Sequence, residues 1–467
     1  MNEYDLITIG GGAGAFAATI KANELGAKTL LINTDLPLGG TCVNVGCIPS
    51  KNLLRAGEIL YYGQHHNFGG IKLRVEKFDF AKTIQEELNL VAALRKEKYE
   101  NVLKSLTNVT FIEGKAKFIS PDEIEVEGKK YQGKKFIIAT GSTANIPAIE
   151  GLKEAGYLTH IEALANKKQP KSLIIIGAGP LGLEFAQMFH HFGTKVTVLQ
   201  RGNTILPRIE PEIVSALHKY LSDERIELYT ETETLSVRRE GLEKVVKAKV
   251  KGIEQEFRAE EILLAAGKTA NTKDLNLGAA QVEMDEKQAI KVNEYQKTSQ
   301  EHIFAVGDVI NQKLRLETTA GKEGTLAAKN ALTGSKESIN YWQVPYAIFT
   351  YPAVAGIGMT DAEVIEKGEK CTCTIVGFSK VPKAHAIGDI RGIIKMVVNN
   401  EDRKILGIHM VAPEAADIIN QGIYILKAKL TVDDLIDSMP VFPTLSEAIK
   451  IAALSFTTDI NKLSCCI

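Results

Sequence analysis

Two cysteine pairs carry most of the chemistry that this sequence offers. Cys42 and Cys47 lie in a glycine-rich segment, and Cys465 and Cys466 are adjacent, one residue before the C-terminus. The chain has only six cysteines. Thiolates exchange with disulfides and are the preferred ligands of soft cations. Two sets of two thiols therefore indicate a soft metal ion or a disulfide as substrate, which one set would capture and the other would supply with electrons.

The spacing of the first pair constrains the local backbone. Cys42 and Cys47 are five positions apart, near a predicted helix start. A regular helix would hold two such sulfurs too far apart to bond, so we expect a distorted turn between them. A helix N-terminus would favour the thiolate form of Cys47. The alternative is a pair of inert, buried cysteines.

The composition is that of an ordinary globular protein. The 467 residues are 45% hydrophobic and 24% charged, with a net charge of −1, and their number leaves room for roughly two to four domains. This charge gives no electrostatic reason to expect nucleic acid or a membrane as partner. No apolar run approaches the ~20 residues that cross a bilayer, and the N-terminus lacks a basic signal region. We therefore expect a cytoplasmic enzyme with catalytic or metal-binding cysteines.

A dinucleotide-binding pattern opens the chain. Residues 5–9 are predicted to form a strand and residues 16–25 a helix, with Gly10, Gly12 and Ala15 in the turn between them. These glycines would let the backbone approach a pyrophosphate at the helix N-terminus.

The same pattern occurs a second time. Gly177, Gly179 and Gly182 lie between a predicted strand at 173–176 and a predicted helix at 183–192. One match is weak evidence, but two matches in this context predict two dinucleotide sites.

The strand after the second turn bears on the choice of nicotinamide. NAD sites usually place an acid at its end, on the ribose 2′-hydroxyl. Here residues 195–199 are followed by Gln200 and Arg201. A guanidinium can pair with a 2′-phosphate, which favours NADPH. The alternative is an ordinary surface arginine.

The rest of the chain extends this scheme. Residues 136–141 and 262–267 are each predicted to form a strand that runs into a glycine turn, and residues 303–308 a strand that ends in Asp308. Residues 76–106 predict a long, charged helix. From about residue 340 the pattern changes to an α+β domain, with predicted strands at 394–398 and 405–410 and predicted helices at about 413–428 and 446–456.

Together these motifs resemble the pyridine nucleotide-disulfide oxidoreductases over nearly the whole chain. Within that family the adjacent cysteines of the tail resemble the mercuric reductases, which use NADPH and FAD to reduce Hg(II) to Hg(0). The resemblance implies an α/β fold with two Rossmann-like domains and a C-terminal α+β dimerisation domain. It divides the chain into an FAD-binding domain at 1–146 and 271–338, an inserted NAD(P)-binding domain at 147–270 and an interface domain at 339–467.

The resemblance also assigns roles. Cys47 would lie against the flavin and Cys42 would face the substrate, while the tail of the partner subunit in a homodimer would deliver Hg(II). The implied catalytic residues are Cys42, Cys47, Cys465, Cys466, Lys51, Glu184 and Glu447, and the four cysteines are the implied metal ligands. The implied FAD contacts are Gly10, Gly12, Ala15, Gly40, Thr41, Lys51, Ala139, Thr140, Gly141 and Asp308; those of NADP are Gly177, Gly179, Gly182, Arg201 and Gly267. Lys51 and Glu184 would form an ion pair, and Asp308 would bond the ribityl chain.

Three positions depart from the family pattern. Phe442 replaces a histidine with which disulfide-reducing members protonate leaving thiols. Mercuric reductases place tyrosines at the positions of Phe442 and Pro180, and neither hydroxyl exists here. The FAD pattern expects an acid where this chain has Asn33, although an amide can still bond a ribose hydroxyl. Many relatives also carry an N-terminal metal-trafficking domain, which we do not expect here.

Three hypotheses follow. The leading one is an NADPH-dependent mercury(II) reductase. A flavoprotein disulfide reductase of the dihydrolipoamide dehydrogenase type is the second, against which Phe442 counts. The third is a metal-sequestering or redox-sensing flavoprotein with little turnover. For Cys371 and Cys373, packing is the favoured interpretation, and metal capture is the minor one.

Overall fold

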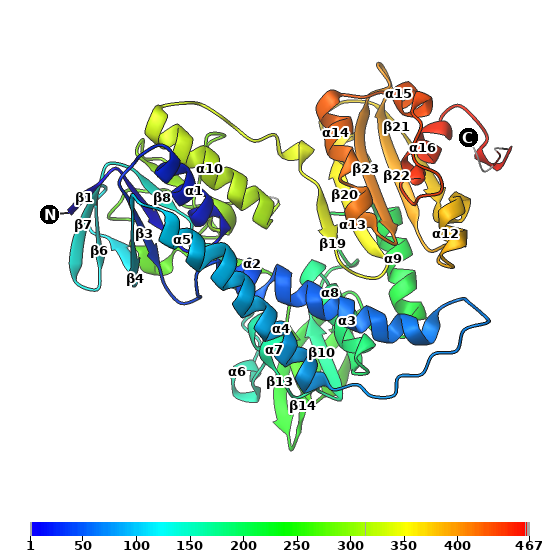
Figure 1. Cartoon of the computed structure of the whole chain (residues 1–467). Coiled ribbons are helices and arrows are strands. Elements are labelled where there is room, and N and C mark those ends of the chain that lie inside the picture. The colour runs from blue at the N-terminus through cyan, green and yellow to red at the C-terminus, as the bar shows by residue number, and fades with distance from the viewer. Residues whose placement is uncertain (1, 313, 463, 465–467) are drawn as a thin grey trace.

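The computed structural model describes residues 2–312, 314–462 and 464, and it has the predicted α/β class (Figure 1). Its first large sheet is parallel and lies near the N-terminus. The strand order is β18 (Ile303–Ala305), β8 (Phe136–Ile138), β2 (Leu6–Ile9), β3 (Thr29–Asn33), β4 (Val109–Glu113). Every residue of β2 and β3 is buried, as expected for a parallel sheet covered on both faces.

Two helices pack closely beside this sheet. They are α1 (Ala13–Glu24) and α10 (Glu317–Thr333). A Cβ on Gly324 would lie 2.0 Å from the carbonyl oxygen of Gly14. Only glycine allows this approach, which fixes the N-terminus of α10 next to the first glycine turn. A small antiparallel group flanks the sheet: β5 (Ala116–Phe118), β6 (Glu123–Val126) and β7 (Lys129–Gly133).

The second parallel sheet lies between β8 and β18 in the sequence, although those two strands pair with each other. Its order is β12 (Glu227–Tyr229), β11 (Lys195–Leu199), β10 (Ser172–Ile176), β16 (Glu261–Leu264). Helix α8 (Pro180–His191) follows β10, and α9 is Pro211–Asp223. An antiparallel meander of β13 (Thr232–Glu240), β14 (Glu243–Val250) and β15 (Ile253–Ala259) was not predicted.

The C-terminal part is an antiparallel sheet with helices, as the α+β prediction required. The order is β19 (Tyr346–Ile348), β20 (Ala353–Gly358), β23 (Ile405–Ala412), β22 (Ile393–Asn399), β21 (Cys371–Gly377). Helix α16 (Glu447–Leu454) matches its prediction closely. The helix predicted at 413–428 is wrong as one element, because turn residues separate α13 (Ala415–Ile418) from α14 (Gln421–Ala428).

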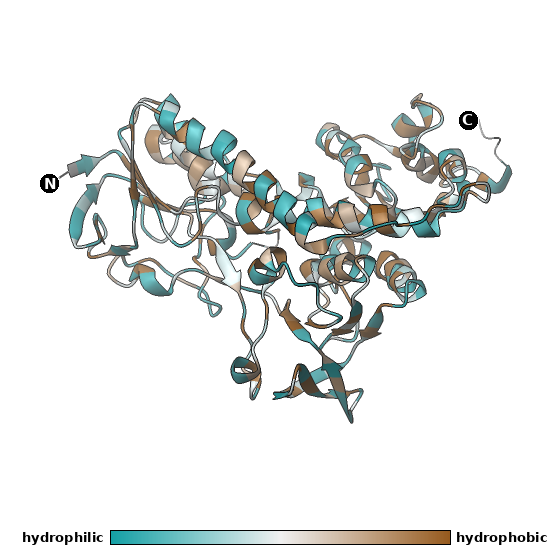
Figure 2. Ribbon diagram, turned by 60° about the horizontal axis from the view of Figure 1, so that its bottom comes forward, coloured by the Kyte–Doolittle hydropathy of each residue, from teal (hydrophilic) through white to brown (hydrophobic). Residues whose placement is uncertain are grey.

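Three helices connect these layers. Helix α2 spans Gly40–Val45, α3 spans Cys47–His65 and α4 spans Phe80–Arg95. One apolar cluster joins α3, α8 and β19 through residues such as Leu53, Phe185 and Ile348. The longer helices carry both hydrophobic and hydrophilic turns, as Figure 2 shows by colour. Within the described ranges, no helix combines the length and apolarity that a membrane span requires.

The structure has a shorter, interrupted helical segment where one helix was predicted at 76–106. Helix α4 begins only at Phe80, where the Asp79 carboxylate accepts the Lys82 amide at 3.0 Å as an N-cap. After α4 the chain passes through a π-helical turn at Lys96–Glu100 into α5 (Asn101–Ser105). Residues 76–79 are therefore not helical.

Helix α4 also buries a carboxyl group. Glu87 is 1% exposed, and neither of its carboxyl oxygens has a hydrogen-bond partner among the described residues. Burial raises the pKa of Glu87 to about 7. Because the unfolded chain has the lower pKa, ionisation of Glu87 opposes folding. This destabilisation is absent at low pH. It grows as the pH rises above the pKa of Glu87 in the unfolded chain, and it is complete above the pKa of Glu87 in the folded protein.

We predict that Glu87→Met stabilises the protein at pH 8, by about 1–3 kcal/mol in the free energy of unfolding, the usual cost of an unpaired buried polar group. The gain should shrink between pH 8 and pH 5, because wild-type Glu87 becomes protonated. Melting temperatures at both pH values measure this. Glu86→Met is the matched control, because Glu86 is exposed on the same helix. An equal gain at both pH values would contradict the assignment.

Candidate redox site

The two cysteines of the first pair lie on either side of a helix break. Helix α2 ends at Val45 and α3 begins at Cys47. Between them, a Cβ on Gly46 would lie 2.8 Å from the carbonyl oxygen of Thr41. A side chain there would displace the backbone that turns back toward Cys42. The distorted turn expected from the sequence is therefore present.

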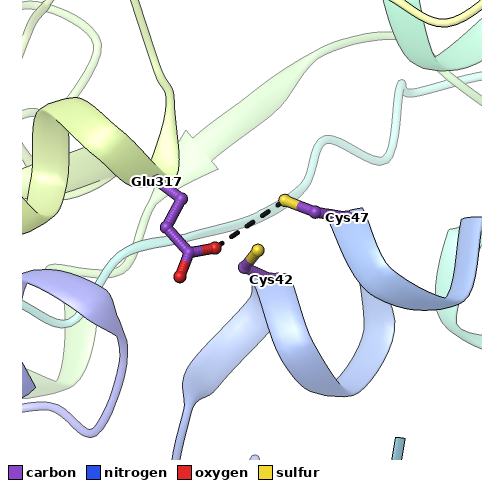
Figure 3. Close-up of side chains that lie close together, drawn as sticks. All are labelled: Cys42, Cys47 and Glu317. Atoms are coloured by element: carbon purple, nitrogen blue, oxygen red, sulfur yellow. Dashed lines mark hydrogen bonds between the residues drawn. The ribbon is translucent and has the colours of Figure 1, made fainter. Parts of the chain in front are cut away.

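Both residues are free thiols in the structure. The sulfurs of Cys42 and Cys47 lie within 4.8 Å of each other, farther apart than the about 2.05 Å of a disulfide. Figure 3 shows both sulfur atoms beside the carboxylate of Glu317. The pair can therefore close to a disulfide after a small movement, or hold a cation between its sulfurs.

The environment of Cys47 opposes the thiolate. Burial raises the pKa of the Cys47 thiol, and the nearby Lys51 ammonium lowers it by a smaller amount. Cys47 is accessible to solvent, but the surrounding protein still desolvates its sulfur. In the protein without flavin, desolvation outweighs the influences that favour the thiolate, which are the Lys51 charge and the backbone hydrogen bond at Cys47 near the start of α3.

An ion pair lies one turn along α3 from Cys47. Lys51 Nζ is 2.8 Å from Glu184 Oε2, on α8. The other oxygen, Glu184 Oε1, accepts the backbone N–H of Phe349 at 2.9 Å, and the Lys51 ammonium lies 4.6 Å from the centre of the Phe349 ring. Glu184 is buried. Both of its oxygens have partners, which is what makes a buried pair tolerable.

Glu317 faces the dithiol and was not predicted. The Cys47 thiol approaches Glu317 Oε2 at 3.9 Å, and the Tyr99 hydroxyl donates to Glu317 Oε1 at 3.3 Å. Burial raises the pKa of Glu317, and no cation among the described residues offsets it. Burial, and to a smaller extent Cys47, raises the pKa of Tyr99. No sequence motif marks Glu317, which is 270 residues from Cys47.

The first glycine turn fits a pyrophosphate. A Cβ on Gly10 would lie 2.3 Å from the Ala139 carbonyl oxygen, and one on Gly40 would lie 2.6 Å from Gly12 Cα. No side chain caps the N-terminus of α1, so its first N–H groups are available to an anion. Ala15 is buried inside α1. A closely packed glycine turn that ends at an uncapped helix N-terminus is what a dinucleotide phosphate needs.

The polar residues around that turn also fit FAD. Asn33 Nδ2 donates to the Leu36 carbonyl at 2.8 Å. Its Oδ1 lies against Gly11, where a Cβ would approach within 2.3 Å. Asn33 therefore offers an oxygen acceptor where the pattern has an acid. Asp308 Oδ2 accepts the Ser142 hydroxyl at 2.7 Å. Of the other predicted FAD residues, Thr41 lies on α2, and Ala139, Thr140 and Gly141 follow β8.

The second glycine turn repeats the first. A Cβ on Gly177 would lie 2.3 Å from the Ala265 carbonyl oxygen, and one on Gly182 would lie 2.0 Å from that of Gly177. Gly179 is the N-cap of α8, without a side-chain cap, and Gly267 has a φ of 102°.

Gln200 and Arg201, the two polar residues that follow β11, have different surroundings. Gln200, which had no assigned role, accepts the Ala178 N–H at 3.1 Å and so holds this turn. Arg201 is exposed.

Glu447 and Phe442 lie in the C-terminal part of the chain. Glu447 Oε2 accepts the Thr444 N–H at 3.0 Å, and Glu447 lines a separate pocket of about 360 Å³ in the C-terminal part. Phe442 is 48% exposed. Cys465 and Cys466 lie outside the described residues.

The cysteines of β21 have apolar surroundings. Cys371 and Cys373 pack against Met359, Val364 and Val397. Burial raises the pKa of Cys373 to about 12. Both observations agree with the packing interpretation.

The fold and the sequence define the class of this protein. The pyridine nucleotide-disulphide oxidoreductase family matches residues 4–324, and the dimerisation domain of the same family matches residues 344–453. The chain therefore belongs to this family of FAD-dependent, pyridine nucleotide-linked oxidoreductases.

Particular relatives can be named within the family. The chain is 38% identical to a mercuric reductase of Lysinibacillus sphaericus over 465 residues, which cover 100% of this chain and 85% of that protein. It is 38% identical to a mercuric reductase of Staphylococcus aureus, over 99% of this chain and 84% of that protein. Among solved structures, the HOCl-induced flavoprotein disulfide reductase RclA from Escherichia coli is similar, with a TM-score of 0.86 and 26% identity over 97% of this chain and 100% of that chain. The Cu(II) complex of RclA has a TM-score of 0.88 and 26% identity, over 98% of this chain and 100% of that chain.

We predict that Lys51→Met shifts the ionisation of Cys47 to higher pH in the two-electron-reduced holoenzyme. The Lys51 charge lowers the pKa of Cys47. Its removal therefore raises that pKa further and lowers the fraction of Cys47 that is thiolate at neutral pH. The pH dependence of alkylation and of the thiolate–flavin charge-transfer absorbance measures the shift. Lys104→Met, an exposed lysine on α5, is the control. A midpoint unchanged from wild type would show that Lys51 does not act on Cys47.

Proposed function

We propose that this protein is an NADPH-dependent mercury(II) reductase. The observation that carries the proposal is the dithiol of Cys42 and Cys47, with two free sulfurs within 4.8 Å beside the Lys51 ammonium. Paired thiolates are ligands that soft cations select. The likeness to mercuric reductases over the full chain supports the same substrate.

The overall reaction balances without a further reactant: NADPH and Hg²⁺ give NADP⁺, H⁺ and elemental mercury. Bound FAD would supply the two-electron transfer from the nicotinamide to sulfur or metal. Gly10, Gly12 and Gly40 would hold its pyrophosphate, Asn33 a ribose hydroxyl and Asp308 the ribityl chain.

The residues of the chain set the state of the sulfurs. Lys51 lowers the pKa of Cys47 against desolvation, and metal binding requires that both thiols lose their protons. Glu184 holds Lys51 in place through its contacts with the ammonium and with the Phe349 amide. In the proposed roles Cys42 receives the metal and Cys47 faces the flavin.

The family match to a dimerisation domain suggests a homodimer. In that arrangement Cys465 and Cys466 of one subunit would deliver Hg(II) to the dithiol of the other. Incoming Hg(II) carries small thiols as ligands, and a pair of thiolates on the tail would displace them by exchange. In the same homodimer, Glu447 of one subunit would face the dithiol of the other.

A disulfide reductase is the second candidate, and the fold similarity to RclA favours it. Disulfide reduction needs an acid that protonates the leaving thiolate. Phe442 occupies the position of that acid and cannot titrate, so we rank this function below metal reduction. One assay separates the two: NADPH oxidation with Hg(II) in excess thiol, with lipoamide and with oxidised glutathione. Turnover of lipoamide without release of elemental mercury would refute the mercury assignment.

We predict that Cys465→Ala combined with Cys466→Ala lowers mercury reduction at least about tenfold in excess thiol, because the competing thiols then keep Hg(II) from the dithiol. NADPH reduction of the bound flavin should be unchanged. Release of mercury vapour and the rate of flavin bleaching measure the two steps. Replacement of Ser464 with Ala, one position earlier, is the control. Full mercury turnover in the double variant would remove the tail from the mechanism.

We predict that Arg201→Ala lowers kcat/KM for NADPH by about 10- to 100-fold and leaves kcat/KM for NADH nearly unchanged. A hydrogen bond to a charged group contributes about 1.5–3 kcal/mol, and only NADPH has the 2′-phosphate. Steady-state kinetics with both nucleotides test this, with Arg225→Ala as a matched surface arginine. Equal losses for both nucleotides, or a wild-type preference for NADH, would refute the NADPH assignment.

A further inference from the structure

The dithiol has an oxygen neighbour as well as its two sulfurs. The sulfurs of Cys42 and Cys47 and a carboxylate oxygen of Glu317 all lie within 4.8 Å of one another. Figure 3 shows the carboxylate of Glu317, from α10, turned toward the sulfurs on α2 and α3. Three elements therefore converge on one point with two sulfur ligands and one oxygen ligand.

The distances suit a bound cation. Cys47 Sγ and Glu317 Oε2 are 3.9 Å apart. Around a tetrahedral ion with metal–sulfur bonds of about 2.3 Å and metal–oxygen bonds of about 2.1 Å, neighbouring ligand atoms are roughly 3.6 Å apart. A movement of a few tenths of an ångström would bring the pair to that separation.

A second residue orients this carboxylate. The Tyr99 hydroxyl donates to Oε1 and leaves Oε2 directed at Cys47. The Tyr99 ring packs edge-on against Phe16, with ring centres 4.9 Å apart and planes at 70°. A Cβ on Gly39 would lie 3.0 Å from the same ring. Tyr99 is thus held on two sides, in the way that outer-shell partners of metal ligands are held.

We propose that Glu317 is a third ligand of the cation held by reduced Cys42 and Cys47, and that this set admits borderline divalent cations such as Cd²⁺ and Zn²⁺. The inference rests on the proposed function only in taking the dithiol as a metal site. Two thiolates satisfy Hg²⁺, whereas Zn²⁺ and similar ions take three or four protein ligands, among which carboxylate oxygen is common. NADPH does not reduce Cd²⁺ or Zn²⁺ to the metal, so these ions would occupy the dithiol as reversible inhibitors.

The test is a titration of the holoenzyme with Cd²⁺, after anaerobic reduction with NADPH. Cadmium–thiolate absorbance in the ultraviolet and calorimetry report binding. Loss of an outer-shell partner already lowers metal affinity by about 10- to 100-fold, so Glu317→Gln should weaken Cd²⁺ binding at least about tenfold. Affinity for Hg²⁺, measured by competition with a small thiol, should change less than about threefold, because sulfur dominates its binding.

Two further variants keep the result specific. Tyr99→Phe removes the hydroxyl that orients the carboxylate but leaves all three ligands, and it should weaken Cd²⁺ binding by a smaller factor. Glu286→Gln removes the same charge from an exposed position and should change nothing. Flavin content and melting temperature confirm that each variant is folded.

The outcomes separate this inference from the proposed function. Cd²⁺ affinity equal in wild type and Glu317→Gln would overturn the ligand assignment, even in an enzyme that reduces Hg(II). Cd²⁺ affinity lost in that variant would support it, even if the wild type released no elemental mercury. Cd²⁺ binding that survives Cys47→Ala would also overturn it, because the ion would then lie elsewhere.

Discussion

The close approach of Gly46 to the carbonyl oxygen of Thr41 is the constraint on which the rest of the site depends. It ends α2 and starts α3 at Cys47, so that two cysteines five positions apart share one point in space. Once α3 begins there, Lys51 follows one turn later and reaches Glu184 on α8. The contact of Glu184 with the Phe349 amide then ties the site to the C-terminal part. Any side chain at position 46 would disturb this whole sequence of contacts.

The side chains at the dithiol are partly buried, and this burial disfavours their charged forms. Burial raises the pKa values of Cys47, Tyr99 and Glu317, and the Lys51 charge and a backbone hydrogen bond lower that of Cys47 by smaller amounts. The protein alone therefore favours neutral groups at the dithiol. A bound cation would reverse this balance, because its charge stabilises thiolate and carboxylate together. This gives a physical reason why the site is better suited to a metal ion than to a free anion.

The sequence predicted the parts of the fold that depend on local patterns. Gly10 and Gly177 mark turns where the backbone approaches a neighbouring carbonyl, and such a need is visible in the residue type. The meander of β13, β14 and β15 was missed because β15 is largely exposed and lysines interrupt the apolar residues of β14, so that no clear apolar alternation marks the strands. Glu317 was missed for a different reason: its importance comes only from α10 packing on α1, which no pattern within either segment reveals.

Phe442 and Glu317 both favour a metal ion over a disulfide as the substrate of the site. A histidine at the position of Phe442 would supply a proton to a leaving thiol, and phenylalanine cannot. Glu317 instead places an oxygen ligand beside Cys47, from the same subunit and from a helix already fixed by Gly14 and Gly324. A site without that proton donor and with a carboxylate beside its sulfurs is poorly equipped to cleave disulfides and better equipped to hold cations. The partner's tail would then need only to exchange thiols, because the coordination of the bound ion could be completed within one subunit.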